Sequence, residues 1–327
     1  MNSIYPWQTD QWQQLSQRHQ AGNLPHALLF AGVKDLGKRQ LAENLAARIL
    51  CSSDSPSCGS CHSCQWLAAN NHPDLFYLQP ADDSKVIKIE QVRELIDSLN
   101  QTAHGKQQVV IIDPAEALNR AAANALLKNL EEPNGAVFFL LISHQASALP
   151  ATIRSRCQML KFAIPSYTLA HDWLKQQLPP KENIQQENIQ QILLLADNIP
   201  LRALDLVTSK ALDEQQKIVQ LFMDLFLASK SPLAVAQTYA ESEPTLVIDV
   251  LWSIIRDLIS IQLRANFPLK YSQWQENLTI ISQRISTLLL FHFLDQLLSL
   301  RKWQEEKINL NLQLQWEEIL INCTGTE

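Results

Sequence analysis

Short continuous apolar runs mark the first half of the chain. They occupy residues 27–31, 109–112 and 137–142, and each is bounded by polar or turn-forming residues. A continuous run of this length is typical of a strand that is buried on both faces of a parallel sheet. The pattern therefore predicts three strands of such a sheet.

An amphipathic helix is predicted between the second and third runs. Asn119 is a suitable N-cap, leucines form an apolar stripe after it, and Pro133 with Gly135 provides a stop signal. A helix that joins two buried parallel strands forms a right-handed crossover unit. Residues 5–19 and 89–99 add further amphipathic helices. The first half is therefore predicted to be an α/β domain.

The second half lacks the residue that turns prefer. The chain has seven glycines, and none falls between Gly135 and Gly325, so this stretch is predicted to be helical throughout. Residues 246–263 and 278–303 predict long helices that are apolar on more than one face. Residues 308–316 alternate with period two, but their apolar positions also fit a helical face, and we predict a helix there.

Composition and charge limit the possible functions. A chain of 327 residues exceeds what one core usually supports, so two or three domains are expected. The net charge of −6 argues against a protein whose main role is to hold nucleic acid on a basic face. Charged residues interrupt the most apolar runs, and the N-terminus lacks the pattern of a secretory signal. We therefore expect a cytoplasmic protein with no membrane partner.

A phosphate-binding loop is suggested after the first predicted strand. Gly32, Gly37 and Lys38 match the loop pattern, but Arg39 stands where the pattern has serine or threonine. In such a loop the lysine reaches the outer phosphates and the hydroxyl holds magnesium, which arginine cannot do. Two interpretations stay open: a vestigial nucleotide site, and a plain strand-to-helix turn with Lys38 in solvent.

Four cysteines predict a metal site in an insertion at about residues 51–75. Cys51, Cys58, Cys61 and Cys64 have the spacing C-x6-C-x2-C-x2-C. Four thiolates suit tetrahedral zinc, and the absence of an open coordination position makes the metal structural. Two histidines are alternative ligands, and the all-cysteine set is the simpler one; the alternatives are His62 and His72.

Several longer motifs resemble the clamp-loader branch of the AAA+ proteins. They are AAANALLKNLEEP at residues 121–133, TIRSRC at 152–157, YPWQTDQW at 5–12 and NLNLQLQWEEILI at 309–321. The resemblance thus covers nearly the whole chain. It implies an AAA+ domain with a parallel sheet at residues 1–165, an all-α lid at 166–208 and an all-α collar that mediates oligomerisation at 209–327.

The resemblance also implies partners. A clamp loader is a heteropentamer, so this chain is expected to meet delta and tau/gamma-type ATPase subunits. Through that complex it would act on a sliding clamp and primed DNA during replication.

The resemblance implies that the ATP site of this chain is silent. In active ATPases of the family a strand ends in Asp-Glu, where the aspartate serves the metal and the glutamate orients the attacking water. Here the pair is Asp113-Pro114, and proline cannot orient water. With Arg39 in place of the hydroxyl, two chemical parts are missing, so no hydrolysis of ATP is expected. Ser143, at the position of a phosphate sensor, is predicted to make capping or sheet-end hydrogen bonds.

Arg156 is the predicted catalytic residue. An arginine beside serine is most often a surface donor, but Ser-Arg-Cys in clamp loaders presents an arginine finger to the ATP of the neighbouring subunit. A planar guanidinium can pair two phosphate oxygens at once. Arg154 is close enough to be confused with it. Arg202 lies near the place of a second sensor arginine, and we predict a surface ion pair for it.

Two other functional classes stay open. The first is an active ATPase of the same fold, which only Gly32, Gly37 and Lys38 favour. The second is a zinc-ribbon nucleic-acid binder, which the four cysteines favour. The acidic balance and the lack of basic residues between those cysteines oppose the second class.

Overall fold

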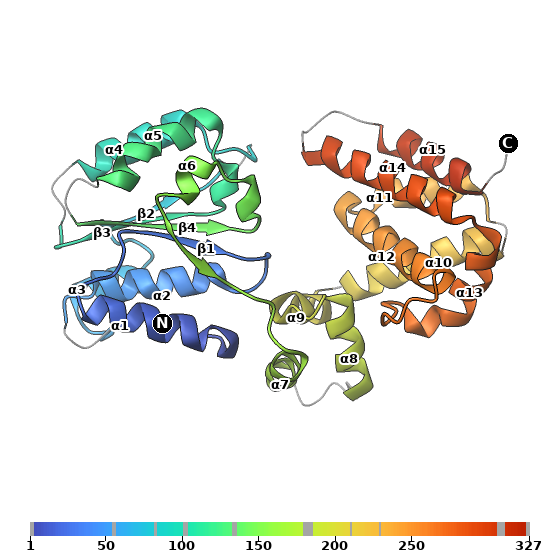
Figure 1. Ribbon diagram of the computed structural model, residues 1–327, viewed down its shortest axis with the longest axis horizontal. Coiled ribbons are helices and arrows are strands. Elements are labelled where there is room, and N and C mark those ends of the chain that lie inside the picture. Colours follow the sequence, from blue (N-terminus) through green and yellow to red (C-terminus); the bar gives the residue numbers. More distant parts are fainter. Residues whose placement is uncertain are drawn as a thin grey trace. The chain divides into compact units, whose positions relative to one another are not determined.

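The first part of the chain is built around one parallel sheet, which the computed structural model shows in Figure 1. The described residues are 3–53, 57–81, 84–100, 104–132, 136–178, 186–209, 211–228, 230–305 and 311–324. Within them the sheet has five strands in the order β2-β3-β4-β1-β5. The strands are β1 Ala27–Ala31, β2 Leu75–Leu78, β3 Gln108–Ile112, β4 Val137–Ser143 and β5 Gln158–Lys161. The three predicted strands are confirmed as β1, β3 and β4.

The helices of this part lie before, between and after the strands along the chain. Those that precede β1 or follow it closely are η1 Pro6–Gln8, α1 Thr9–Gln20, α2 Lys38–Leu50 and α3 His62–Ala68. The others are α4 Ile89–Leu99, η2 Ala115–Ala117, α5 Arg120–Glu131, η3 Ala146–Ala148, α6 Ala151–Arg154 and α7 Tyr167–Gln177. Asn119 caps α5 as predicted, because its side chain accepts from the Ala122 N–H at 2.7 Å. The predicted stop at Pro133 and Gly135 lies outside the described residues.

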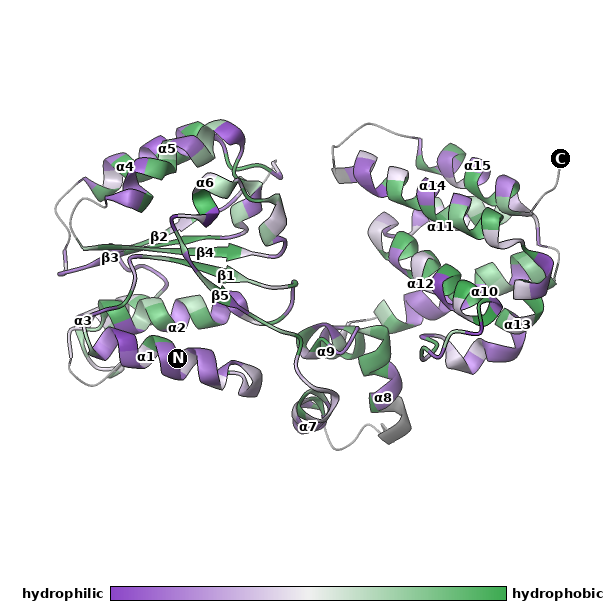
Figure 2. Ribbon diagram, viewed as in Figure 1, coloured by the Kyte–Doolittle hydropathy of each residue, from purple (hydrophilic) through white to green (hydrophobic). Residues whose placement is uncertain are grey.

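Helices cover both faces of the sheet. Figure 1 shows α4, α5 and α6 on one face and α1, α2 and α3 on the other. Alternate residues of β3 enter the two cores: Val110 and Ile112 pack with the first group, and Val109 and Ile111 with the second. Every residue of β1 and β3 is buried. The continuous apolar character of these strands, visible in Figure 2, follows from this burial on both faces.

The rest of the chain is helical where it is described. Its elements are α8 Gln186–Leu195, α9 Pro200–Thr208, α10 Ala211–Leu227, α11 Pro232–Glu241, α12 Pro244–Gln262, η4 Ser272–Trp274, α13 Gln275–Arg284, α14 Thr287–Glu305 and α15 Leu312–Thr324. The core contains fully buried Tyr239 and Trp316. The Tyr239 hydroxyl donates to the Ile218 carbonyl at 3.1 Å, so its burial leaves no unpaired donor. None of the described helices is both long and apolar enough to cross a membrane.

Three sequence predictions need correction. The glycine-free stretch is not helical throughout, because β4 and β5 lie at its start. The predicted helix at 278–303 is broken between α13 and α14, where the Gln262 amide donates to the carbonyls of Ser282 and Ile285 at 2.8 and 2.7 Å. The predicted helix at 5–19 begins only at Thr9, after the 3-10 turn η1. The helix predicted at 308–316 is confirmed from Leu312 onward, and residues 308–310 lie outside the described residues.

The chain divides into two compact units. The first comprises Met1–Gln177 and Asn198–Leu201, and the second comprises Leu178–Asp197 and Arg202–Glu327. The segment predicted as a separate lid, residues 166–208, is thus shared, with α7 in the first unit and α8 in the second. The division into three functional domains stays a prediction.

Candidate functional sites

The glycines of the predicted phosphate loop are required by close approaches. A side chain at Gly32 would meet the carbonyl oxygen of Phe162 at 2.5 Å. Gly37 precedes α2 with a φ of +76°, and a side chain there would meet the ring of Tyr5 at 2.4 Å. Because L-residues rarely adopt this φ, both geometry and space select glycine. The loop that joins β1 to the N-terminus of α2 thus needs glycine at both of these positions.

Lys38 is buried at the start of α2, so the interpretation that places it in solvent is wrong. Its exposed fraction is 3%, and its Nζ donates to the carbonyls of Gly32 and Val33, both at 2.6 Å. Burial lowers the pKa of Lys38 from 10.5 to about 8, because the charged ammonium loses hydration. The ammonium group thus folds back onto the loop that carries it.

Asp113, directly after β3, lies beside the same loop. Its Oδ2 is 3.4 Å from Nη1 of Arg39, and its Oδ1 is 3.9 Å from Nε2 of His144. Arg39 also pairs with Glu43 at 3.0 Å. The Arg39 guanidinium therefore faces the Asp113 carboxylate, which would bind a metal ion in an intact site. Arg39 supplies a positive charge where that metal ion would otherwise do so.

Three buried polar atoms at or beside the end of β4 have no hydrogen-bond partner among the described residues. They are the hydroxyl of Ser143, Nδ1 of His144 and Oε2 of Glu116 in η2, whose other oxygen accepts from the His144 N–H at 2.8 Å. The prediction that the Ser143 side chain makes capping or sheet-end hydrogen bonds is therefore wrong. Only its backbone takes part, since its carbonyl accepts from the Gly32 N–H at 3.3 Å.

Residues 5–8 also contact the loop, and the sequence analysis did not identify them as part of the site. The Trp7 indole and the Gln8 amide both donate to the Leu36 carbonyl, at 3.0 and 2.7 Å. The ring of Tyr5 stacks on Trp7 at 4.9 Å, and both rings meet Trp173 of α7 edge-on. The two hydrogen bonds to Leu36 join residues 29 and 28 positions apart, so no local pattern signals them.

The four predicted metal ligands lie together. Their sulfur atoms are all within 4.8 Å of one another, and four of the six separations are 3.8, 3.9, 4.0 and 3.8 Å. Tetrahedral zinc with Zn–S bonds of about 2.3 Å places sulfurs about 3.8 Å apart. The N–H groups of Cys61 and Cys64 donate to the sulfurs of Cys58 and Cys61. The cluster could therefore hold a metal ion such as zinc.

The two alternative histidine ligands lie outside this cluster. His72 Nε2 is 2.5 Å from the Ser63 hydroxyl, and its Nδ1 accepts from the Asp74 N–H at 3.0 Å, so both ring nitrogens have protein partners. His62 packs against Trp66. Among the described residues the potential ligand group is the four cysteines alone.

Arg156 lies just after α6, and two parts of the chain hold its guanidinium. Its Nη2 forms an ion pair with Glu131 of α5, and its Nη1 donates to the Thr152 carbonyl of α6 at 3.0 Å. Its Nε is buried without a partner among the described residues. Arg154, two residues earlier, is exposed. The predicted ion pair of Arg202 is confirmed, with Asp197 at 3.5 Å.

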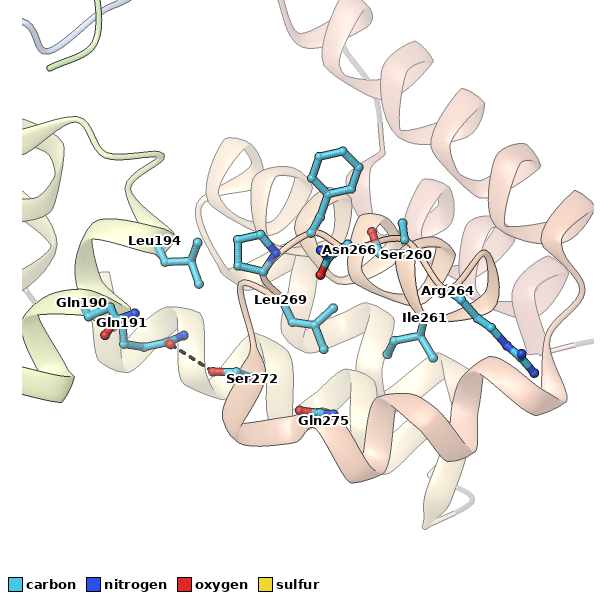
Figure 3. Close-up of a pocket in the computed structure, with 13 residues that line it drawn as sticks. Gln190, Gln191, Leu194, Ser260, Ile261, Arg264, Asn266, Leu269, Ser272 and Gln275 are labelled. Carbon is cyan, nitrogen blue, oxygen red and sulfur yellow. Dashed lines mark hydrogen bonds between the residues drawn. The ribbon is translucent and has the colours of Figure 1, made fainter. Parts of the chain in front are cut away.

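The second unit contains a separate cavity of about 900 Å³. It lies among α8, the end of α12 and the segment before α13, and Figure 3 shows Gln191 pointing toward Ser272 beside it. The Ser272 hydroxyl donates to the Gln191 amide oxygen at 3.1 Å. None of the predicted site residues lines this cavity, and Arg264 is its only charged lining residue.

Comparison with known proteins shows clear relatives. The family model described as "DNA polymerase III, delta subunit" matches residues 7–166, and that of its C-terminal part matches residues 209–325. DNA polymerase III subunit delta' of Pseudomonas aeruginosa is 34% identical over 325 residues, which covers 98% of this chain and 97% of that protein. The same subunit of Haemophilus influenzae is 32% identical and covers 80% of this chain and 79% of that protein. A DNA polymerase III gamma subunit-related protein of Thermotoga maritima has a TM-score of 0.46 at 17% identity and covers 95% of this chain and 99% of that one.

Proposed function

The chain belongs to the family of delta-prime subunits of the DNA polymerase III clamp loader, which act in DNA replication, and on this premise we propose that it is a catalytically silent AAA+ subunit. It assembles with delta and tau/gamma-type subunits in a heteropentamer. It supplies Arg156 to the ATP site of a neighbour, so that the complex can load a sliding clamp onto primed DNA.

The observation that carries this proposal is the charge arrangement around Asp113. Arg39 occupies the place of the metal-binding hydroxyl, and its guanidinium lies 3.4 Å from the Asp113 carboxylate. Pro114 stands where a water-orienting carboxylate is needed. Hydrolysis of a phosphoanhydride needs both the metal ion and the oriented water. The chain therefore lacks the means to turn over ATP in its own site, although Gly32, Gly37 and Lys38 keep the shape of the loop.

Arg156 is suited to act on a phosphate that another subunit holds. The pair with Glu131 and the hydrogen bond to Thr152 use one N–H of each terminal nitrogen. A guanidinium has five N–H groups, so further donors stay available for a phosphate. The two contacts restrict the side chain, which lowers the entropy that is lost when it binds.

The cysteine cluster is proposed to hold structural zinc. All four thiols are free of disulfide bonds, which agrees with a reducing cytoplasm as the proposed location. Four protein ligands leave no position for substrate, so the metal stabilises the insertion and takes no part in catalysis. The alternative of an active ATPase rests only on the glycines and lysine of the loop, and a zinc-ribbon nucleic-acid binder has no support beyond the cysteines.

The test compares two neighbouring arginines in a reconstituted clamp loader. Arg156→Ala is expected to leave assembly intact and to lower ATP-dependent clamp loading by roughly tenfold or more, since fingers supplied in trans accelerate hydrolysis by roughly 10³ to 10⁵. Arg154→Ala, the matched control, removes the same charge two residues away and should have the smaller effect. Assembly is checked by size-exclusion chromatography. Unchanged loading with Arg156→Ala would show that the finger assignment is wrong.

A further inference from the structure

The cavity of the second unit is an open groove that the proposed function does not use. Its volume of about 900 Å³ lies within the range of about 300–1,000 Å³ that ligand sites occupy. None of its lining residues is fully buried, so solvent reaches it directly. In Figure 3, Gln190 and Gln191 lie at one end of this groove and Arg264 lies at the other.

Hydrogen bonds fix the wall of the groove that joins α8 to the segment before α13. The Gln191 amide donates to the Lys270 carbonyl, and its oxygen accepts from the Ser272 hydroxyl at 3.1 Å. The buried carboxylate of Asp257 in α12 accepts from the Tyr271 N–H at 2.9 Å. A wall that is held in this way is in place before anything binds, so little ordering entropy is lost on binding.

Apolar side chains of the groove are left uncovered. Phe267 is 73% exposed, although phenylalanine is among the residues that are most often buried. Leu194, Ile261 and Leu269 also line the groove, and each is only partly buried. These side chains offer a surface against which an aliphatic or aromatic side chain of a partner can be buried.

The end of α12 places Arg264 at an unusual backbone position. The N–H groups of Arg264 and Ala265 donate to the carbonyls of Ile261 and Ser260 at 3.1 and 2.9 Å, which is the Schellman pattern of a helix end. Arg264 has a φ of +49°, where helices usually have glycine because L-residues are disfavoured. The backbone therefore does not favour arginine here, and its side chain is the part that a function would use.

The Arg264 guanidinium gives the groove a positive end. It is the only charged group among the described lining residues, and it makes no hydrogen bond or ion pair within the described part of the chain. The amides of Gln190, Asn266 and Gln275 likewise have no side-chain partner there. A guanidinium can pair a carboxylate through two N–H groups, and an amide can both donate to and accept from a peptide backbone.

These features select among possible occupants. Nucleic acid is held by several cations along its backbone, whereas this groove has one and the chain has a net charge of −6. A small anion needs donors that converge on one point, but Arg264 and the amide of Gln190 lie at opposite ends of the groove (Figure 3). An extended peptide with one acidic residue beside an apolar one matches the charge, the amides and the apolar surface together.

We propose that the groove binds an extended segment of a partner protein. A carboxylate of that segment pairs with Arg264, and a neighbouring aliphatic or aromatic side chain packs against Phe267 and Leu269. The free amides, such as that of Gln275, bind the peptide backbone. The groove shares no residue with the phosphate loop, with Arg156 or with the cysteine cluster, so this proposal goes beyond the proposed function and does not depend on it.

A peptide selection tests the proposed chemistry without assuming a partner. A phage-displayed library of random short peptides is depleted on the immobilised Arg264→Ala chain and then selected on the unmodified full chain. An aspartate or glutamate close to a leucine, isoleucine or aromatic residue should be enriched. A selection in which no such acidic and apolar motif is enriched would overturn the proposal.

Fluorescence anisotropy with a fluorescein-labelled copy of the most enriched peptide measures each contribution. Arg264→Ala should weaken binding by about tenfold or more, because a charge-assisted pair is lost, and Phe267→Ala by about tenfold. Replacing the acidic residue of the peptide by its amide should weaken binding to the unmodified chain but not to the Arg264→Ala chain. Arg301→Ala is the matched control, because it removes an arginine of α14 that does not line the groove.

Circular dichroism establishes whether each variant is folded. If Arg264→Ala does not fold, Arg264→Gly removes the same side chain at a φ that glycine adopts readily, and it should show the same loss. Equal affinity for the acidic peptide and its amide form, or an equal loss with Arg301→Ala, would overturn the proposal. Binding of oligodeoxythymidylate through Arg264, or dimerisation of the isolated chain that Arg264→Ala abolishes, would assign the groove to another occupant and would equally overturn it.

Discussion

Removal of zinc should loosen the insertion between Cys51 and Asp74 and leave the sheet intact. The insertion has little core of its own: α3 has seven residues, and Cys64 is the only one of them that is buried. A helix this short does not persist in water without outside support. The sulfur cluster supplies that support, through the predicted metal bonds and through N–H groups that donate to sulfur.

The contacts of the insertion and of the residues that follow it indicate how far the loosening should spread when zinc is removed. Structural zinc contributes about 10–16 kcal/mol in zinc-finger peptides, which exceeds what a seven-residue helix can offer in its place. The loosening should stop at Asp74, whose carboxylate accepts from the N–H groups of His104 and Gly105 at 2.9 and 2.7 Å. Beyond it β2 is paired with β3 along its whole length. The larger core therefore does not depend on the metal.

Hydrogen exchange followed by mass spectrometry, combined with elemental analysis, measures this directly. One zinc per chain is expected, and a chelator should accelerate exchange in residues 57–72 while β1, β3 and β4 stay protected. Cys58→Ser should act as the chelator does, whereas Cys323→Ser, a buried cysteine of the second unit, should leave the zinc content unchanged. Protein prepared without chelator that contains no metal, or chelation that unfolds the sheet, would refute this reasoning.

Three further predictions concern the loop and the second unit. The isolated chain should hydrolyse ATP no faster than background even with magnesium and primed DNA, because Arg39 and Pro114 replace the metal-binding hydroxyl and the water-orienting carboxylate. Phosphate release measures this hydrolysis. Turnover that Lys38→Ala abolishes would contradict the prediction. Gln262→Leu should lower the free energy of unfolding by about 1–3 kcal/mol, because the carbonyls of Ser282, in the last turn of α13, and Ile285, just after it, lose their donor. Urea unfolding measures this, and an unchanged midpoint would count against it. The pKa of Lys38 falls from 10.5 in the unfolded chain to about 8 in the folded one, so between these pH values the unfolded chain binds more protons. Stability should therefore rise with pH in that window, by up to about 1.4 kcal/mol per pH unit; Lys38→Met should lack this rise, and parallel pH profiles of the two chains would exclude it.

The sequence predicts best what local patterns encode. Strands β1, β3 and β4 are buried on both faces, so their residues form continuous apolar runs that are visible without a structure. β5 is missed, because it lies at the edge of the sheet and its residues are mostly exposed, which gives no such run. The break before Thr287 is missed because its polar groups form hydrogen bonds with the Gln262 side chain, which comes from another helix. Gln262 donates to the Ile285 carbonyl and accepts from the Thr287 hydroxyl.

The candidate sites show the same division. The cysteine spacing is a local signal, and the four sulfurs do lie together. The pairing of Arg156 with Glu131 joins residues 25 positions apart, and that of Trp7 with Leu36 joins residues 29 apart. Such pairs depend on how the helices and loops pack in three dimensions. Lys38 is buried as well, with its ammonium group against the carbonyls of Gly32 and Val33, and no local pattern signals this.

The central claim is that this subunit does no ATP chemistry in its own site and acts on the site of a neighbour. ATP turnover by the reconstituted clamp loader, with sliding clamp and primed DNA, tests both halves when this subunit carries either Lys38→Ala or Arg156→Lys. We predict that Lys38→Ala leaves turnover unchanged, whereas Arg156→Lys, which keeps the charge but loses the planar fork, lowers it by roughly tenfold or more. Turnover that falls with Lys38→Ala and is unaffected by Arg156→Lys would contradict the account.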